Sequence, residues 1–255
     1  MKIKGLDTLV KHFPEMASLK FALIVLGTFS LTTVYFLLSD RIPTWTIDSQ
    51  IVVFALGFLI VRRAFTQRAA LIEKYGKDAY QQAAMRFIFP GVSILFAAIA
   101  HTAYMGDVNK MIFTQGVFPK IAHILGWYWV VVGALLWIRS VLTFGIDNLA
   151  LLYLYHPQEG RIVKTDIYRI LRHPVYAGII RLCIGLALLN TGIFALSFIP
   201  FLPLLFFGWV RLVEEKELLE RLPDYAAYRD KTPAFWVKPR DIPAFFKFLI
   251  FGRVL

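Results

Sequence analysis

The sequence predicts an all-α integral membrane protein with about six transmembrane helices and a helical hairpin toward its C-terminal end. Its 255 residues are 58% hydrophobic and 16% aromatic, with a mean hydropathy of +0.62, which is more apolar than a soluble domain of this length. The apolar residues form long blocks, and about 20 helical residues are needed to cross the ~30 Å hydrocarbon core of a bilayer. Positive charge alternates along the chain in step with these blocks.

Three apolar blocks lie in the first part of the chain. They are Phe21–Leu38, Pro43–Val61 and Phe87–Met105. The second is the weakest, because Asp48 and Gln50 interrupt its first half, and the third carries one notable polar residue, His101. Each block approaches the length of a membrane span, so we expect three transmembrane helices here.

Three further blocks follow in the second part. They are Ile121–Phe144, Tyr176–Leu189 and Ile193–Val213. The last two flank the turn signal Asn190–Gly192, which indicates the tip of a tight helical hairpin. Pro200 and Pro203 should kink the final helix, because proline removes a backbone donor and clashes with the preceding turn.

The distribution of Lys and Arg indicates the orientation of these helices. Of the 28 such residues, three lie in the predicted outer loops, Arg41, Lys110 and Lys120, and one, Arg181, lies within a span. All the others fall in the predicted inner segments, as the positive-inside rule requires. We therefore expect six spans with both termini cytoplasmic.

Charge and composition exclude several classes of function. The net charge of +11 is explained by cationic loops beside an anionic membrane leaflet, so we expect no nucleic-acid partner. The single cysteine, Cys183, allows no internal disulfide. No pair of histidines or acids has the spacing of metal ligands, so we expect no metal. Mostly polar residues precede the first apolar block, so we expect no cleavable signal peptide.

Two of the predicted inner segments are long. Arg62–Met85 is polar and alanine-rich, and it should extend the second helix or lie at the membrane surface. Gly145–Tyr176 lacks helical periodicity and shows strand-like alternation over Leu149–Tyr155. A loop of this length in a compact protein usually has a function, and its aromatic and β-branched residues argue against disorder.

The third inner segment, Arg211–Arg240, begins with adjacent carboxylates where the sixth helix should leave the membrane. Neighbouring side chains on an α-helix point about 100° apart, so at most one of Glu214 and Glu215 should face the bundle interior. Two acids at this depth need cations to neutralise them. Arg211 on the same helix and Arg172 across the preceding loop are the candidates.

Together these segments resemble a known family. The run "GRIVKTDIYRILRHPVYAG", a hairpin, "RLVEEKELL" and "DYAAYRDKTPAF" are similar to integral-membrane methyltransferases of the isoprenylcysteine carboxyl methyltransferase and phospholipid N-methyltransferase group. The matching positions are Tyr168, Arg172, His173, Pro174, Tyr176, Gly178, Glu214, Glu215, Tyr225 and Tyr228. The family's initial glycine is absent, since Asp166 stands near its place. The resemblance covers about Gly126–Pro239 and leaves the first three helices unexplained.

The resemblance implies methyl transfer from S-adenosylmethionine, with S-adenosylhomocysteine as product, in cytoplasmic loops and helix ends. No Gly-x-Gly-x-x-Gly follows a strand pattern, so no Rossmann domain is expected. Arg172 and His173 would offer donors to the cofactor's carboxylate, with Pro174 turning the chain so that both point into the bundle mouth. Glu214 or Glu215 would bind its ammonium group.

Aromatic and small residues complete the expected cofactor site. Tyr168 and Tyr176 would face the adenine or the sulfonium, whose positive charge suits an aromatic wall. Gly178 belongs to the motif. Gly133 would allow close approach either of the cofactor or of a neighbouring helix, and the sequence leaves both open.

The acceptor is expected to be lipid-like, because the site opens beside a hairpin kinked at Pro200 and Pro203 and so faces the bilayer sideways. A carboxylate acceptor, such as that of a prenyl-cysteine-like lipid, would be positioned by Arg172 or Arg229. An amine acceptor would need a base, for which Glu215 is the candidate. A phospholipid amine and a small hydrophobic thiol are the alternatives to the carboxylate.

The chain is thus expected to have three parts. Residues 1–115 form the first three helices with their connector, residues 116–240 form the methyltransferase core, and residues 241–255 form an amphipathic tail. Two other classes compete with this interpretation: a non-catalytic membrane binding protein or transporter, and a membrane reductase that uses a nicotinamide cofactor. Neither explains the clustering of the charged motifs on one face as directly.

The charge asymmetry generates a test of topology. A reporter fused after Leu255 and one inserted within residues 106–118 should give opposite signals, because an odd number of spans separates them. The measurement is the activity of a reporter that works on only one side of the membrane. The same signal from both fusions would contradict the six-helix arrangement.

Overall fold

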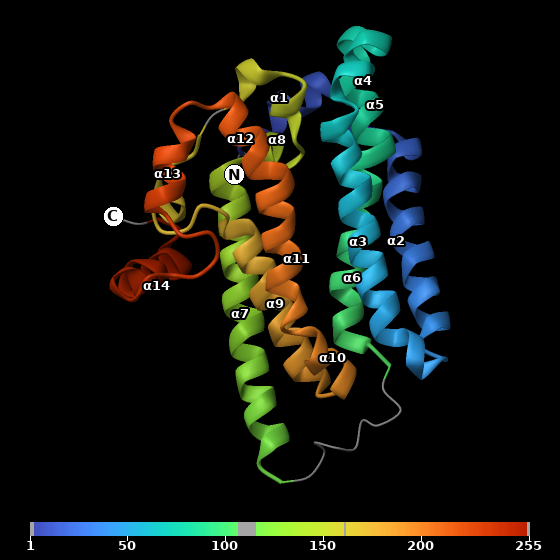
Figure 1. The fold of residues 1–255 in the computed structure, drawn as a ribbon, viewed down its shortest axis with the longest axis vertical. Coiled ribbons are helices and arrows are strands. Elements are labelled where there is room, and N and C mark those ends of the chain that lie inside the picture. Colours follow the sequence, from blue (N-terminus) through green and yellow to red (C-terminus); the bar gives the residue numbers. More distant parts are fainter. Residues whose placement is uncertain (1–2, 107–115, 161, 254–255) are drawn as a thin grey trace.

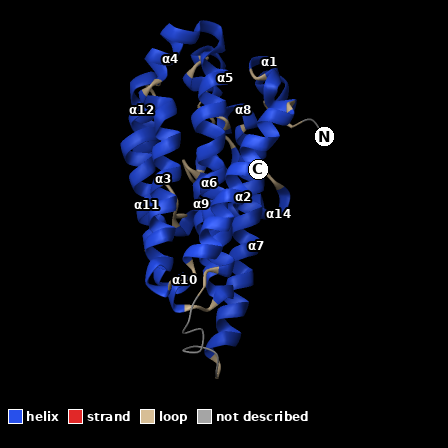
Figure 2. Cartoon of the chain, turned by 90° about the vertical axis from the view of Figure 1, so that its right-hand side faces the viewer, coloured by secondary structure: helices blue, strands red, loops and turns tan. Residues whose placement is uncertain are grey.

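The computed structural model describes residues 3–106, 116–160 and 162–253, and all regular structure in these residues is helical (Figure 2). Lys110 and Arg161, which entered the charge count, lie outside the described residues. The all-α prediction is confirmed.

Five helical segments are long and apolar enough to cross a membrane. They are Leu19–Ser39, Pro43–Thr66, Arg68–Tyr104, Phe118–Phe144 and Ile193–Arg221. A sixth apolar helix, α9 (Pro174–Asn190), has 17 residues and lies at the lower limit for a span. All six predicted blocks are therefore helical, and the chain is an integral membrane protein.

The helices from α2 to α6 form one group (Figure 1). It contains α2 (Leu19–Ser39), α3 (Thr46–Thr66) and α6 (Phe89–Tyr104), with α6 packed against the other two. The polar connector continues as the short helices α4 (Arg68–Tyr75) and α5 (Ala79–Ala83), and a π-helical turn, Ala84–Ile88, leads into α6. The connector therefore extends the bundle beyond the predicted end of the second span.

The second group contains α7 (Phe118–Phe144), α9 and a broken last helix (Figure 1). The break lies at Pro200, between α10 (Ile193–Phe198) and α11 (Phe201–Trp209), which confirms the predicted interruption. A π-helical turn, Val210–Glu214, then joins α11 to α12 (Glu215–Arg221).

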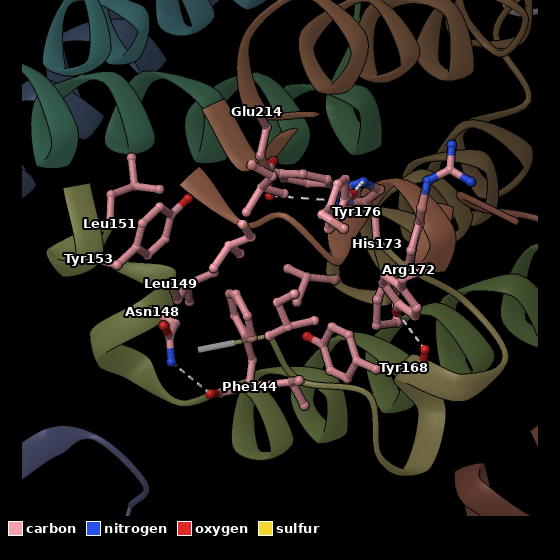
Figure 3. A pocket seen from close by; sticks show the side chains of 18 of the residues that line it. Phe144, Asn148, Leu149, Leu151, Tyr153, Tyr168, Arg172, His173, Tyr176 and Glu214 are labelled. Atoms are coloured by element: carbon pink, nitrogen blue, oxygen red, sulfur yellow. Dashed lines mark hydrogen bonds and ion pairs between the residues drawn. The ribbon is translucent and has the colours of Figure 1, made fainter. Parts of the chain in front are cut away.

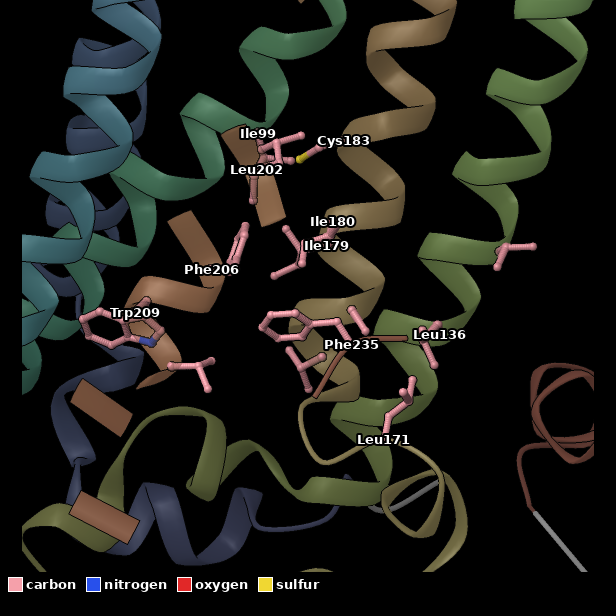
Figure 4. Packing of buried hydrophobic residues seen from close by; sticks show 14 of the residues in the cluster. Ile99, Leu136, Leu171, Ile179, Ile180, Cys183, Leu202, Phe206, Trp209 and Phe235 are labelled. Carbon is pink, nitrogen blue, oxygen red and sulfur yellow. The ribbon is translucent and has the colours of Figure 1, made fainter. Parts of the chain in front are cut away.

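Buried apolar side chains join the two groups. Ile99 of α6, Ile179 and Cys183 of α9, and Leu202 and Phe206 of α11 belong to one continuous core (Figure 4). Because α6 packs directly on α9, this core holds the first residues of α9 at a fixed place relative to α3 and α6.

The strand-like alternation over Leu149–Tyr155 does not form a strand. The segment forms the end of α8 (Ile146–Leu149) and a 3₁₀ turn, Leu152–Leu154. Four consecutive residues from Leu152 to Tyr155 are buried, so the apolar pattern reflects enclosure on all sides rather than one face of a sheet. The Tyr155 hydroxyl donates to the Ala64 carbonyl at 2.8 Å, which fastens the loop to α3.

Short helices close the end of the bundle that holds this loop. α1 (Leu6–His12) packs against α8, and α13 (Tyr225–Lys231) follows α12 (Figure 1). α14 (Ile242–Phe251) packs on α7, where Arg139 donates to the carbonyls of Phe248 at 3.2 Å and Ile250 at 2.9 Å. These bonds satisfy carbonyls that the last turn of a helix leaves free.

α7 and α9 pack closely because glycines face each other's backbones. A Cβ on Gly133 would lie 2.5 Å from the Leu182 amide nitrogen, and one on Gly178 would lie 2.7 Å from the Trp137 amide nitrogen. Membrane helices associate through such small residues, since lipid supplies little hydrophobic drive between helices. Of the two approaches left open for Gly133, the structure shows the one to a neighbouring helix.

We expect Gly133→Ala to destabilise the protein by about 1–3 kcal/mol, because the added methyl group must push two backbones apart. Gly27→Ala on α2 is the matched control, since its Cβ would meet nothing within 4 Å. Thermal unfolding in lipid nanodiscs provides the measurement. Equal melting temperatures for the two variants would contradict the packing role of Gly133.

Candidate active site

A cleft of about 750 Å³, counted to its open mouth, lies where the long loop, the start of α9 and the segment after α11 meet (Figure 3). Its polar and charged lining comes from three parts of the chain. These residues are Asn148, Tyr153, Tyr168, Arg172, His173, Tyr176, Glu214, Arg221, Tyr225 and Tyr228. The sequence motifs therefore converge on one enclosed site.

Glu215 is the centre of a buried charge network behind this lining. Its Oε1 accepts from Arg172 Nε at 2.5 Å, from His173 Nε2 at 3.2 Å and from the Tyr225 hydroxyl at 3.4 Å. Glu215 is 6% exposed. A carboxylate at this depth is stable only when cations and donors surround it, and here three of them share one oxygen.

Arg172 also fastens a strap of chain, Thr232–Phe235, across the start of α9. Its Nη1 donates to the carbonyls of Thr232 and, at 3.2 Å, of Arg229. The backbone amides of Arg172 and His173 donate to the next two carbonyls of the strap, at 3.0 and 3.2 Å. These bonds hold the strap on the chain just before Pro174, which occupies the first turn of α9 as proline prefers.

The fourth strap carbonyl, that of Phe235, accepts from Arg181 Nη2 at 3.1 Å. This buried arginine, which the sequence left without a role, lies over the ring of Trp236 at 5.1 Å and of Phe245 at 5.7 Å. The bond from Arg181 therefore holds the strap at a fourth residue, after the three that are bonded by Arg172 and His173.

Two buried polar atoms in the cleft have no hydrogen-bond partner among the residues that the structure describes. One is Glu214 Oε2; the other oxygen of this side chain lies 3.7 Å from His173 Nδ1. The second is Arg221 Nη1, whereas Nε and Nη2 of Arg221 donate to Glu217 at 2.6 and 3.4 Å. Leaving such atoms unpaired costs about 1–3 kcal/mol each, so this cleft is suited to a ligand with both a donor and an anionic group.

Of the two adjacent glutamates, Glu214 lines the cleft and Glu215 lies behind it. Both carboxylates approach His173, Glu214 at 3.7 Å and Glu215 at 3.2 Å. A π-helical turn, Val210–Glu214, ends where α12 begins. Single π turns of this kind occur frequently at functional sites. Arg211, one of the two expected cations, lies over the Phe207 ring at 5.9 Å, and Arg172 alone pairs with Glu215.

Neutral tyrosines form much of the cleft wall. Burial raises the pKa of Tyr153 and Tyr168 well above the ordinary value, and it also raises the pKa of Tyr228. Burial, followed by the charges of Glu215 and Glu214, raises the pKa of Tyr225. The wall therefore stays uncharged at neutral pH and keeps its hydroxyl groups as donors.

The structure brings most of the predicted site residues together. Tyr168, Arg172, His173, Pro174, Tyr176 and Glu214 line the cleft, and Glu215 lies directly behind Arg172. Gly133 and Gly178 lie in the interface of α7 and α9. The Arg229 side chain, 37% exposed, pairs with Asp230 instead of lining the cleft.

Sequence reasoning missed Arg221 and Tyr153. The guanidinium carbon of Arg221 lies 4.5 Å from the centre of the Tyr153 ring, and both residues line the cleft. A signal for Arg221 was present, because it follows Glu214 by two helical turns and so shares its face. Tyr153 carried no such signal, since its loop has no regular period.

A second cavity, of about 1180 Å³ and apolar, lies between the two groups of helices. Half of its lining belongs to the part of the chain before residue 116, from Leu9 to Ile99, and the rest belongs to α7, α8, α9, α11 and the long loop. Leu149, Leu151, Val175 and Tyr176 line both this cavity and the polar cleft. The two spaces therefore share one wall.

Comparison with known proteins bears on the function of this cleft. No curated protein and no solved structure matches the chain significantly. Residues 121–223, from α7 through α12, match the family model described as phospholipid methyltransferase. The match contains the cleft residues from Asn148 to Arg221 and ends before Tyr225. Over these residues the chain is similar to that family of membrane methyltransferases, which includes isoprenylcysteine carboxyl methyltransferase-like proteins.

Proposed function

We propose that the protein transfers a methyl group from S-adenosylmethionine to a lipophilic acceptor at the membrane. The family match supports a membrane methyltransferase with a lipid-like substrate. The observation that carries the choice of cofactor is the pair of unpartnered buried atoms, Glu214 Oε2 and Arg221 Nη1, in one cleft.

The residues of the cleft fit this cofactor. Its ammonium group would bind Glu214 and its carboxylate would bind Arg221, so that each unpartnered atom gains a charge-assisted hydrogen bond. Both atoms belong to residues that line the cleft.

The sequence also argues against a nicotinamide dinucleotide. Nucleotide phosphates are usually bound at a helix N-terminus that follows a glycine-rich loop, and this sequence has no such motif. A reductase therefore fits this cleft less well than a methyltransferase.

When bound, the cofactor supplies a reactive methyl group on a positively charged sulfur. The chain's own contribution is to orient and to exclude water, since an in-line displacement gains most from proximity. Tyr168, Tyr176 and Tyr228 offer neutral aromatic walls for the positively charged part of the cofactor or its adenine. Arg172 and Glu215 act mainly by holding the strap and His173 in place.

The apolar cavity is the proposed site of the acceptor's tail. The tail of a lipid that enters sideways moves from one apolar environment to another, so the cavity would select it by packing rather than by removing CH₂ groups from water. Because Val175 and Tyr176 belong to both spaces, a head group at their shared wall would lie beside the cofactor cleft. Phe96 and Trp137, edge to face at 5.8 Å between α6 and α7, line the cavity where a lipid would enter sideways.

A carboxylate, such as that of a prenyl-cysteine-like lipid, remains our first candidate for the methylated group. Arg172 lines the cleft and donates through Nε and Nη1, while its Nη2 donates to none of the described residues. That nitrogen would orient the carboxylate. An amine is the second candidate, because it would need a base, and Glu215, the candidate from the sequence, already accepts from Arg172, His173 and Tyr225.

We expect Glu214→Gln and Arg221→Gln each to weaken binding of S-adenosylhomocysteine about tenfold to a hundredfold, because each removes one charge-assisted partner. Isothermal calorimetry on the purified protein in nanodiscs gives the affinities. Glu220→Gln, an exposed position on the same helix, is the matched control and should bind as the wild type does.

Two outcomes would count against the cofactor assignment. Wild-type affinity in both folded variants would remove Glu214 and Arg221 from the site. Binding of a nicotinamide dinucleotide in preference to S-adenosylhomocysteine would favour a reductase, and binding of neither would favour a non-catalytic membrane protein.

The acceptor is tested by methyl transfer from labelled cofactor to prenyl-cysteine analogues, aminophospholipids and short thiols. We expect the long-chain acids to be the best acceptors, because only they engage both the apolar cavity and Arg172. The measurement is the amount of label that is recovered in the extracted lipid phase. Transfer only to acceptors that lack an apolar tail would show that the cavity does not hold the substrate.

A further inference from the structure

Trp209, the last residue of α11, lies outside every motif identified in the sequence and is 7% exposed. Its indole lines the apolar cavity and does not line the polar cleft. It stacks on Phe58 of α3 at 5.1 Å and meets Phe65 edge-on at 5.7 Å. Both phenylalanines belong to α3, in the first group of helices, so the ring is held from outside the part of the chain that matches the family.

The indole nitrogen of Trp209 also has a hydrogen-bond partner. Trp209 Nε1 donates to the Tyr176 hydroxyl oxygen at 3.1 Å. Tyr176 lines both the cleft and the cavity, and Glu214 lines the same cleft (Figure 3). Tyr176 therefore lies between Trp209, on the side of the apolar cavity, and the cleft that contains Glu214.

The chemistry of these groups determines which atom donates and which accepts. An indole N–H only donates, so the tyrosine oxygen must be the acceptor of this bond. The tyrosine's own hydroxyl proton must then point away from the indole. Glu214, whose Oε2 has no partner among the described residues, is the carboxylate that lines the cleft together with Tyr176.

We propose that Trp209 is a positioning residue for the cofactor. By occupying the tyrosine oxygen it directs the Tyr176 hydroxyl proton toward Glu214, and it thereby holds that carboxylate where it meets the ammonium group. The proposal rests on the assignment of the cleft to S-adenosylmethionine. It adds to that assignment a residue that lies on the acceptor side of the shared wall.

A purely space-filling role predicts a different response to mutation. Phenylalanine keeps the apolar ring in the stack with Phe58 but lacks the N–H. Trp209→Phe should therefore preserve the core while releasing the Tyr176 hydroxyl. Tyr176→Phe removes the same bond from its other end, so the two changes report on one interaction.

The experiment measures S-adenosylhomocysteine affinity by calorimetry for wild type, Trp209→Phe, Tyr176→Phe and the double variant, with melting temperatures taken in parallel. We expect Trp209→Phe to weaken binding about three- to tenfold, as for the loss of one neutral hydrogen bond. In the Tyr176→Phe background the tryptophan change should have no further effect, since interacting residues are not additive. Trp127→Phe, on the exposed face of α7, is the control and should retain wild-type affinity.

Two results would overturn the proposal: wild-type affinity in Trp209→Phe, or losses from the two single variants that add fully in the double variant. If Trp209→Phe fails to fold, Tyr176→Phe decides alone, because unchanged affinity there excludes any effect through its hydroxyl. Failure of the wild type to bind S-adenosylhomocysteine is a separate result that rejects the cofactor assignment itself.

Discussion

The arrangement of the site follows from one constraint, the burial of the Glu215 carboxylate at the end of a membrane bundle. A charge removed from water is stable only beside an opposite charge and with its lone pairs satisfied. Arg172 supplies the charge, and because its guanidinium is a rigid fork, the same side chain also reaches the strap. His173 and Tyr225 complete the shell around Glu215. Glu214 is thus left with an oxygen that no described residue uses.

The two groups of helices divide the proposed chemistry between them. The second group and the segments that follow it supply the charged cleft, whose lining residues all lie between Phe144 and Tyr228. The helices before residue 116 supply half of the residues that line the apolar cavity, and Phe58 and Phe65 of α3 pack against Trp209 of α11. Under the proposed function, changes in those helices would alter which tails fit while the cleft stays the same.

The fold was predictable because its determinants are local in the sequence. Block length predicted six apolar helices, the Asn190–Gly192 turn predicted the hairpin, and Pro200 predicted the break in the last helix. The convergence of Arg172 with Glu215 was also open to prediction, since buried acids require cations.

The remaining features depend on geometry that a sequence pattern does not encode. A π turn follows Trp209 and ends at Glu214, and nothing in the residues of that turn distinguishes it from α-helix. Leu149–Tyr155 alternates like a strand, but its residues Leu152–Tyr155 are all buried. Arg221 was overlooked because its pair with Glu217 resembles an ordinary surface pair four residues apart.

The single cysteine of the chain has no exposed surface, since Cys183 lies at the centre of the core between α9 and its neighbours (Figure 4). Thiol reagents react with accessible thiolates, so this side chain is shielded from them while the bundle is folded. A cysteine introduced at an exposed site would then be the one thiol that a water-soluble reagent reaches. Pairs of such sites, one on α4 and one on α13, allow spin or fluorescent labels to follow how the two groups of helices move against each other. The native sequence serves as the background for such labelling without removal of any residue.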